Sequence, residues 1–194
     1  MNKNNYNRTP YNYEQNDNYY EPNYSKMSIR EELETRYNEL QKQKNCYARF
    51  NGRNFDLYDG EQLKYSLDAM SRKEGYQCKE YQNIPNAGPI PEGIYYMRQN
   101  QRQTIDPLRA IAGLSPFKYG WRGGIPSWGI RRIPLVPDKS TNTYGRGGFF
   151  SHGGWTKGSA GCIDTPFQTK EISNFMDECN HDVPVYVKYP QECW

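Results

Sequence analysis

The chain has 194 residues, a mass of 22.8 kDa and a formal net charge of +3, from 25 Lys and Arg against 22 Asp and Glu. Positive and negative charges nearly cancel, so the chain lacks the excess of positive charge that is typical of nucleic-acid-binding proteins. Nucleic acid is therefore not an expected partner. Hydrophobic residues make up only 35% of the chain, but 18 Tyr, 7 Phe and 4 Trp allow aromatic side chains to fill a small core. This composition favours one mainly β domain with an arm over a helical bundle or two full domains.

The N-terminal arm has a composition that does not support a folded core. Residues 1–25 contain 8 Asn and 6 Tyr but no Leu, Ile, Val or Phe, so burial of apolar surface cannot offset the entropy of ordering. We predict a disordered Asn/Tyr-rich arm over residues 1–27. No apolar run reaches the length of about 18–20 residues that spans a bilayer, and residues 1–30 lack an apolar signal-peptide stretch. No membrane span and no conventional signal peptide are therefore expected.

Residues 28–45 have the pattern of an amphipathic helix or linker. Ser28 and Glu31 have capping-box spacing, and apolar side chains then recur every three or four residues. We expect the folded domain to occupy residues 46–194.

The first part of this domain reads as short strands joined by tight turns. The dipeptides Asn51-Gly52 and Asp59-Gly60 separate three runs rich in aromatic and aliphatic residues. Both dipeptides tolerate the positive φ that two-residue hairpin turns require. A β-meander is therefore predicted over residues 47–67.

The middle of the chain is less regular. Prolines and glycines over residues 85–93 predict an ordered loop, followed by a strand over 94–97. Residues 102–147 are rich in Gly, Pro, Arg and Trp, with short strands predicted only near 128–130 and 133–135. Irregular segments of this length tend to be functional or mobile.

The C-terminal part predicts a buried strand over 148–152, a helix and a last strand over 183–187. The helix is expected to start at Thr165-Pro166, because proline is favoured in the first turn, and to run through Met176. The predicted class is mainly β (α+β), a meander or sandwich with one helix after the glycine-rich segment and a short N-terminal helix.

Chemistry-bearing residues gather between His152 and Cys162. Nine residues separate them, four of which are Gly, so the connecting loop can fold tightly enough to bring imidazole and thiol together. A neighbouring imidazole accepts the thiol proton and raises the thiolate fraction, which is the basis of Cys/His catalysis. Gly161 has no Cβ, which allows backbone N–H groups around Cys162 to point at a developing oxyanion.

Two other readings of these residues stay open at this point. A lone cysteine is often a small buried apolar residue, and a lone histidine a satisfied polar group. A zinc site from His152, Cys162, Asp164 and His181 is a further option, but no ligand spacing such as C-x-x-C or H-E-x-x-H is present. We therefore expect no metal and no cofactor, and we expect His181 to be a turn residue.

The run HGGWTKGSAGCID, with NAGPIPEGIYYM and TYGRGGFFSHGG upstream, resembles L,D-transpeptidases of the YkuD type. The resemblance is closer to the branch found among type VI secretion effectors that attack peptidoglycan, and it spans roughly residues 46–190. It implies an L,D-transpeptidase-like fold with Cys162 as the nucleophile and His152 as the general base. Gly161 and Cys162 would supply oxyanion-hole amides, and Ser159 and Gly153 belong to the same motif.

The chain departs from the wider YkuD pattern at two positions. Ala160 stands where many members carry His, and Asp164 where many carry Arg. Arg146 could replace that arginine, because a guanidinium can bind a carboxylate bidentately; a packing role is the alternative. Tyr144, Trp155 and Asp164 are the other residues that we expect near substrate. The aromatic residues expected to line the cleft, unless they pack in the core, are Trp121, Trp128, Trp155 and Tyr144.

The family reaction implies a thioacyl-enzyme formed on a peptidoglycan stem peptide, then resolved by water (L,D-carboxypeptidase) or by an amine (L,D-transpeptidase). We expect a monomeric antibacterial effector, exported without a conventional signal peptide, that acts in the periplasm or cell wall. An immunity protein and a secretion-system component are the further partners implied. The alternatives are a non-catalytic wall-binding or adhesin-like module, and an NlpC/P60-type peptidase, which is disfavoured because that family places Cys before His.

Four cysteines remain besides Cys162. An even number is consistent with two disulfides in an oxidising compartment, and the sequence leaves their pairing open. They are Cys46, Cys78, Cys179 and Cys193.

Overall fold

The computed structural model describes residues 45–76, 78–106, 108, 121, 123–155, 158–191 and 193. The strands are β1 (Cys46–Phe50), β2 (Asn54–Asp59), β3 (Gln62–Asp68), β4 (Gly93–Met97), β5 (Gln103–Thr104), β6 (Arg131–Pro137), β7 (Phe150–His152), β8 (Ile163–Asp164) and β9 (Val183–Val187). The helices are η1 (Lys79–Tyr81), η2 (Gln99–Gln101), α3 (Gly124–Trp128) and α4 (Thr169–Cys179). The arm predicted over 1–27, and nearly all of the helix predicted over 28–45, lie outside the described residues.

The meander predicted at the start of the domain is confirmed. β1 pairs with β2, and β2 with β3, both antiparallel. In the first turn the side-chain Oδ1 of Asn51 accepts hydrogen bonds from the N–H groups of Arg53 (2.9 Å) and Asn54 (2.8 Å). In the second turn Gly60 has φ +58°, a conformation that glycine adopts without steric cost.

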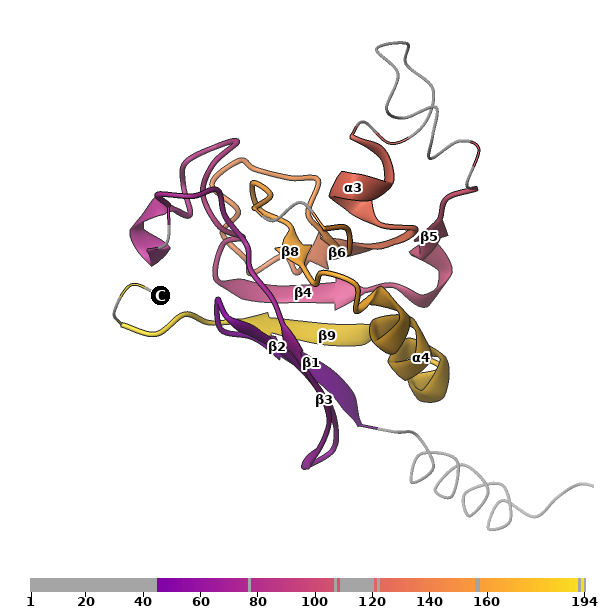
Figure 1. Cartoon of the computed structure of the whole chain (residues 1–194). Helices are drawn as coiled ribbons and strands as arrows, with labels where there is room; N and C mark the ends of the chain where they lie inside the picture. Colours follow the sequence, from indigo (N-terminus) through magenta and orange to yellow (C-terminus); the bar gives the residue numbers. More distant parts are fainter. Residues whose placement is uncertain are drawn as a thin grey trace, which may run out of the picture. The chain divides into compact units, whose positions relative to one another are not determined.

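The nine strands of the described residues belong to one curled sheet, in the order β3-β2-β1-β9-β4-β6-β7-β8, with β5 paired to β6 (Figure 1). The last strand, β9, lies between β1 and β4, parallel to β1 and antiparallel to β4. β7 and β8 form a parallel pair at one end of the sheet. This arrangement confirms the mainly β class with a helix after the glycine-rich segment.

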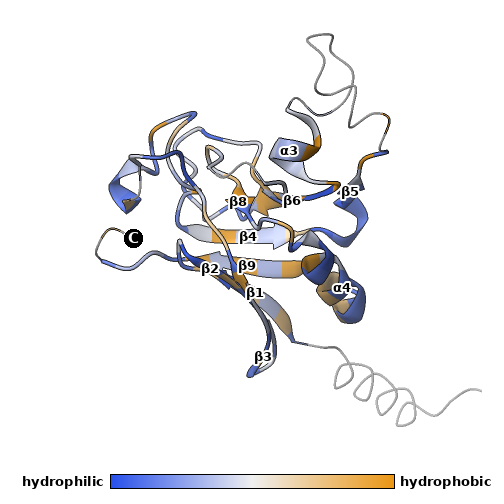
Figure 2. Ribbon diagram, viewed as in Figure 1, coloured by the Kyte–Doolittle hydropathy of each residue, from blue (hydrophilic) through white to orange (hydrophobic). Residues whose placement is uncertain are grey.

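The core lies on one face of the sheet and is covered by α4. Figure 2 shows apolar and polar residues interleaved on this helix and on the strands beside it. The residues of α4 that are buried are Thr169, Ile172, Phe175, Met176 and Cys179. Each fully buried side chain of the size of Ile, Met or Phe contributes about 1.5–3 kcal/mol, so this face holds α4 on the sheet. Within the described part of the chain, no helix has both the length and the apolar character needed to cross a membrane.

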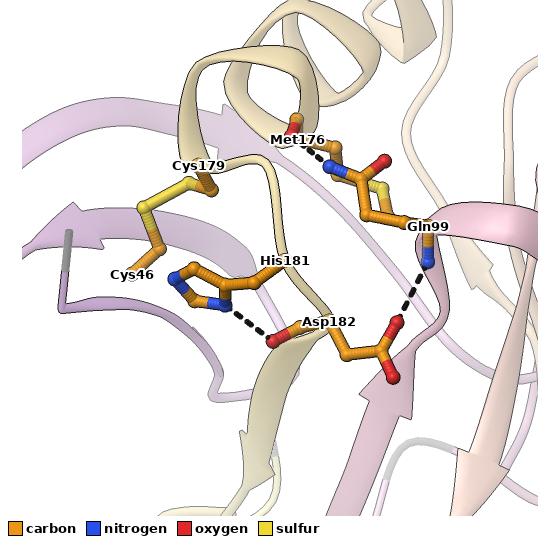
Figure 3. The surroundings of a disulfide bond; sticks show 6 residues. All are labelled: Cys46, Gln99, Met176, Cys179, His181 and Asp182. Carbon is orange, nitrogen blue, oxygen red and sulfur yellow. Dashed lines mark hydrogen bonds between the residues drawn. A yellow bond between two sulfur atoms is a disulfide. The ribbon is translucent and has the colours of Figure 1, made fainter. Parts of the chain in front are cut away.

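Two disulfides tie distant parts of the domain together, as the cysteine count predicted. Cys46 at the start of β1 is bonded to Cys179 at the end of α4 (Figure 3). Cys78, just before η1, is bonded to Cys193 near the C-terminus. Next to the first disulfide, Gln99 donates from its side chain to Met176 O. The structure thus gives the pairing that the sequence left open.

Two predicted elements are wrong in detail. The strand expected near 128–130 is instead the end of the one-turn helix α3, which stops at Gly129 with φ +67°. The helix expected from Thr165 begins only at Thr169. Phe167 adopts φ +63° and interrupts it, while the N–H of Thr165 donates to His152 O (2.8 Å). Thr165 is therefore held by the β7 strand rather than by a helix.

Candidate active site

The parallel pairing of β7 and β8 places His152 opposite Asp164. Paired residues of neighbouring strands project to the same face, so the two side chains meet. Both are buried, with 3% and 2% of their surface exposed. His152 Nε2 lies 2.9 Å from Asp164 Oδ1, so the two side chains form a close ion pair.

The Asp164 carboxylate also organises the glycine-rich loop that leads to Cys162. Its Oδ2 accepts the N–H groups of Gly158 (3.0 Å) and Ser159 (2.8 Å), and its Oδ1 accepts the Ser159 hydroxyl (2.6 Å). The carboxylate is thereby engaged inside the protein. Substrate contact by Asp164 stays a prediction. Ser159 helps to hold the loop in place through its two hydrogen bonds to this carboxylate.

The imidazole of His152 lies between two acceptors. Its Nδ1–H donates to Gly153 O (2.9 Å), and the Asp164 carboxylate lies beside Nε2. Burial by itself lowers the pKa of His152, but hydrogen bonding and charge interactions with Asp164 and Cys162 outweigh burial and raise the pKa to about 10. The ring is therefore a cation at neutral pH. Gly153, predicted as part of the motif, contributes its carbonyl.

Cys162 is the free cysteine of the described residues, since the other four form disulfides. Its side chain is buried, with Sγ 3.9 Å from Gly148 O, and it is one of the groups that raise the pKa of His152. The structure thus brings together the thiol and the imidazole that the sequence singled out. Their catalytic roles stay predictions.

Gly161 is required by its surroundings as well as by its backbone. Its φ is +91°, and a Cβ there would lie 2.6 Å from Arg146 Nη2 and 3.0 Å from the Phe149 ring. In this conformation the Gly161 N–H donates to Ser159 O (3.0 Å). An oxyanion role for this amide, which stays a prediction, would need that bond to be exchanged for one to substrate.

Arg146 is held by backbone carbonyls. Its Nη1 donates to Gln82 O and to Pro89 O (2.7 Å), and its Nη2 donates to Gly88 O (2.9 Å). The guanidinium also lies 5.7 Å from the centre of the Phe149 ring. These contacts support the packing role that the sequence left open, because they tie the loop before β4 to the strand segment before β7. Binding of a substrate carboxylate by the other N–H groups of the Arg146 guanidinium stays a prediction.

Arg132 is a site residue that the sequence reasoning missed. It pairs with His152 across β6 and β7, and its guanidinium lies 4.2, 4.8 and 4.6 Å from the ring centres of Trp121, Trp128 and Phe150. The Trp128 ring in turn lies 4.6 Å from the His152 ring. The alternation of β6, in which Ile133 is buried on the other face, is a signal that would have placed Arg132 on the His152 side.

Two arginines, Arg132 and Arg146, interact electrostatically with Cys162. Burial lowers the pKa of Arg132 and of Arg146, and interaction with Cys162 counteracts that effect in both. With the imidazolium of His152, three cationic groups interact with Cys162.

The remaining predicted residues lie at the surface or elsewhere. Tyr144 is 48% exposed and borders a cavity of about 280 Å³ beside η1. Trp155 is 54% exposed, and its backbone N–H donates to Pro126 O (2.9 Å). Substrate contact by either stays a prediction. His181 lies beside the Cys46–Cys179 disulfide (Figure 3), in the turn before β9, and β4 and β6 separate β9 from β7. Of the four zinc ligands considered from the sequence, His181 is therefore separated from His152, Cys162 and Asp164.

The structure places a buried free thiol, an imidazolium and a carboxylate together on a curled, mainly β sheet. The Tlde1 domain model matches residues 68–187, and the chain belongs to this family of type VI effector domains. The match confirms the resemblance to the effector branch given by the sequence motifs. A comparison with curated proteins found no relative.

Solved structures similar to this chain include three L,D-transpeptidases. They are an enzyme from Mycobacterium smegmatis (14% identity, TM-score 0.41, covering 75% of this chain and 59% of that one), a cysteine-to-serine mutant from Enterococcus faecium (18%, 0.43, 74% and 49%) and L,D-transpeptidase 1 of Mycobacterium tuberculosis (13%, 0.40, 76% and 63%). The chain spans about half to two thirds of the length of these structures.

Proposed function

We propose that the protein is a cysteine-dependent peptidoglycan L,D-transpeptidase or L,D-carboxypeptidase that acts as an antibacterial effector. The observation that carries this proposal is the buried free thiol of Cys162 beside the cationic His152, in a chain of the Tlde1 domain family. A free thiol beside an imidazole is the pair that nucleophilic cysteine catalysis uses, because the imidazole exchanges protons with the thiol and with the reacting groups.

In the first step the Cys162 thiolate attacks the carbonyl carbon at the L-centre of a diaminopimelate in a stem peptide. A C–S bond forms and the carbonyl π pair moves to the oxygen, which Arg132 and nearby backbone N–H groups stabilise. The oxyanion then collapses and the C–N bond to D-alanine breaks. The His152 imidazolium gives its proton to the leaving amine, which yields a thioacyl-enzyme and a neutral imidazole.

In the second step water or an amine attacks the thioester. The neutral His152 takes a proton from the attacking group, the C–S bond breaks, and the thiolate–imidazolium pair is restored. Water gives a shortened stem, and an amine gives an exchanged or cross-linked stem. Asp164 takes no proton in this scheme: it keeps the imidazole charged and oriented.

The cysteines fit the compartment that this proposal requires. Four of them are paired in two disulfides, which form and persist in oxidising spaces such as the periplasm. We propose that a type VI secretion system delivers the protein to the periplasm or cell wall, where it acts as a monomer on stem peptides. A producing cell would then need an immunity protein against it.

The test is incubation of purified disaccharide-tetrapeptide with the wild type, Cys162→Ala and Cys162→Ser, followed by mass spectrometry. Loss of one D-alanine with the wild type alone would support a carboxypeptidase, and incorporation of an added D-amino acid would support a transpeptidase. Identical products from the wild type and Cys162→Ala would refute the nucleophile. Retention of muropeptide by the wild type without any turnover would instead favour a wall-binding module.

The proton-transfer role has its own variant. His152→Ala is expected to lower the rate by about 10²–10⁴-fold, the usual contribution of general acid–base catalysis. His181→Ala is the matched control, because His181 is the other histidine of the chain and lies beside a disulfide. Equal rates for the two variants, with both proteins folded, would contradict the role of His152.

A further inference from the structure

A second cavity, of about 220 Å³, lies between β5, the start of β6 and the exposed side of α4. We call it the α4 pocket. Its lining is rich in cationic side chains and holds a single acidic one. The charged residues are Arg102, Arg131, Arg132, Lys170 and Asp177.

The positive charge of the α4 pocket is largely uncompensated. Asp177 is already paired with Arg102, whose Nη1 lies 2.6 Å from its Oδ1. Arg102 also donates to Ser173 O (3.3 Å). In the part of the chain that the structure describes, no side chain or carbonyl is seen to accept from Arg131 or from Lys170. An anion that enters the pocket would therefore meet unsatisfied donors.

Arg132 joins this pocket to the thiol site. Its Nε donates to Gln103 Oε1 (2.7 Å), and Gln103 lines the pocket. Its guanidinium rests on the rings of Trp121 and Trp128, and Arg132 lies opposite His152 in the sheet. Arg132 is therefore part of the pocket lining and also the strand partner of His152.

We propose that the α4 pocket binds a carboxylate of the stem peptide while the scissile bond lies at Cys162. This inference rests on the proposed function. The volume suits one acidic side group rather than a whole muropeptide, and a guanidinium binds a carboxylate through two parallel hydrogen bonds. Ser173 and Asn174 on the α4 wall add neutral polar groups beside the cations.

The test measures binding of purified disaccharide-tetrapeptide to the full-length Cys162→Ala protein by calorimetry. The added double substitution Arg131→Gln/Lys170→Gln is expected to weaken binding by about 3- to 10-fold, an effect that high salt diminishes. The same peptide with its side-group carboxylates amidated should bind both proteins equally. Asp177→Asn should tighten binding, because it removes the one negative charge of the lining.

Lys64→Gln is the matched control, because Lys64 is an exposed cation on the edge strand β3 at the other end of the sheet. The proposal is overturned if the double substitution and Lys64→Gln bind alike, or if amidation of the peptide does not change the effect. It is also overturned if inorganic phosphate binds the pocket but the tetrapeptide does not compete with it.

The failure of this inference can be told from the failure of the proposed function. The double variant Arg131→Gln/Lys170→Gln is also assayed in the protein that retains Cys162. Turnover with the same KM as the wild type would refute carboxylate binding in the α4 pocket, but it would leave the proposed enzymatic function intact. If the wild type binds the tetrapeptide in a carboxylate-dependent way but does not turn it over, the proposed enzymatic function is refuted and carboxylate binding in the α4 pocket stands.

Discussion

Replacement of Asp164 by asparagine tests the electrostatic design of the site most directly. Asparagine keeps the size of the side chain and one carbonyl oxygen, so the loop contacts from Gly158 and Ser159 retain an acceptor. The negative charge 2.9 Å from His152 Nε2 is lost. Burial then still lowers the pKa of His152, but the ion pair that raises this pKa is gone.

The magnitude follows from the pKa of His152. The rise from an ordinary 6.5 to about 10 corresponds to about 5 kcal/mol in favour of the imidazolium, at about 1.4 kcal/mol per unit. Asp164 and Cys162 share this effect against the opposing burial. Without the carboxylate we expect the pKa of His152 to fall toward 6.5. A ring with that pKa is about 3% protonated at pH 8, so the rate at pH 8 should drop by about 30-fold relative to the wild type.

The sign of the stability effect follows from the same shift. A group whose pKa is raised by folding stabilises the native state fully below its unfolded value, here about 6.5, and loses that effect as the pH rises through about 10. The wild type should therefore lose stability between about pH 7 and pH 10. In Asp164→Asn this part of the pH dependence should be much weaker.

The assay is an NMR titration of the imidazole signals. The chain has two histidines, so His181→Gln assigns the spectrum at once. Ser159→Ala is the matched control, because it removes a hydroxyl donor to Asp164 Oδ1 but keeps the charge. A His152 signal that titrates near 6.5 in the wild type would refute the reasoning, and so would one that still titrates near 10 in Asp164→Asn.

Two further substitutions test the packing of the site and of the fold by urea unfolding. Gly161→Ala should lower the free energy of unfolding by about 1–3 kcal/mol more than Gly145→Ala: both glycines have positive φ, but only at Gly161 would a Cβ meet Arg146 Nη2, at 2.6 Å. Equal losses would contradict the close contact. Cys46→Ala/Cys179→Ala should cost about 3–5 kcal/mol, because that disulfide closes a loop over a sequence separation of 133. An unchanged midpoint and slope would rule out this contribution.

Local signals in the sequence predicted the local structure of the sheet. Asn51-Gly52 specifies a hairpin because its own side-chain and backbone preferences set the turn. The position of β9 between β1 and β4 carries no such signal, because it depends on pairing between residues far apart in the chain. The end of α3 at Gly129 was missed for a related reason. A Cβ there would lie 3.0 Å from Gly154 N, a contact that only the folded chain creates.

The sequence predicted the central pair of residues in the candidate site, but not the residues that strand pairing places around them. The glycine-rich spacing indicated that Cys162 and His152 meet, and they do. The place of Asp164 depends on the register of β7 against β8, in which a slip of one residue would turn its side chain to the other face. Arg132 depends on the register of β6 against β7 in the same way. Short strands without strong turn signals leave such registers undetermined in the sequence.

The charges around the thiol fit a site built for anions rather than for a neutral base. His152 is a cation at neutral pH, and Arg132 and Arg146 add two more positive groups that interact with Cys162. Asp164 is the one buried carboxylate among the residues that the structure describes, and it contacts the imidazolium and the loop before Cys162. Burying such groups costs folding free energy unless partners compensate them. In the proposed reaction these buried cations would stabilise the negatively charged species that form at Cys162, which offsets the cost of burying them.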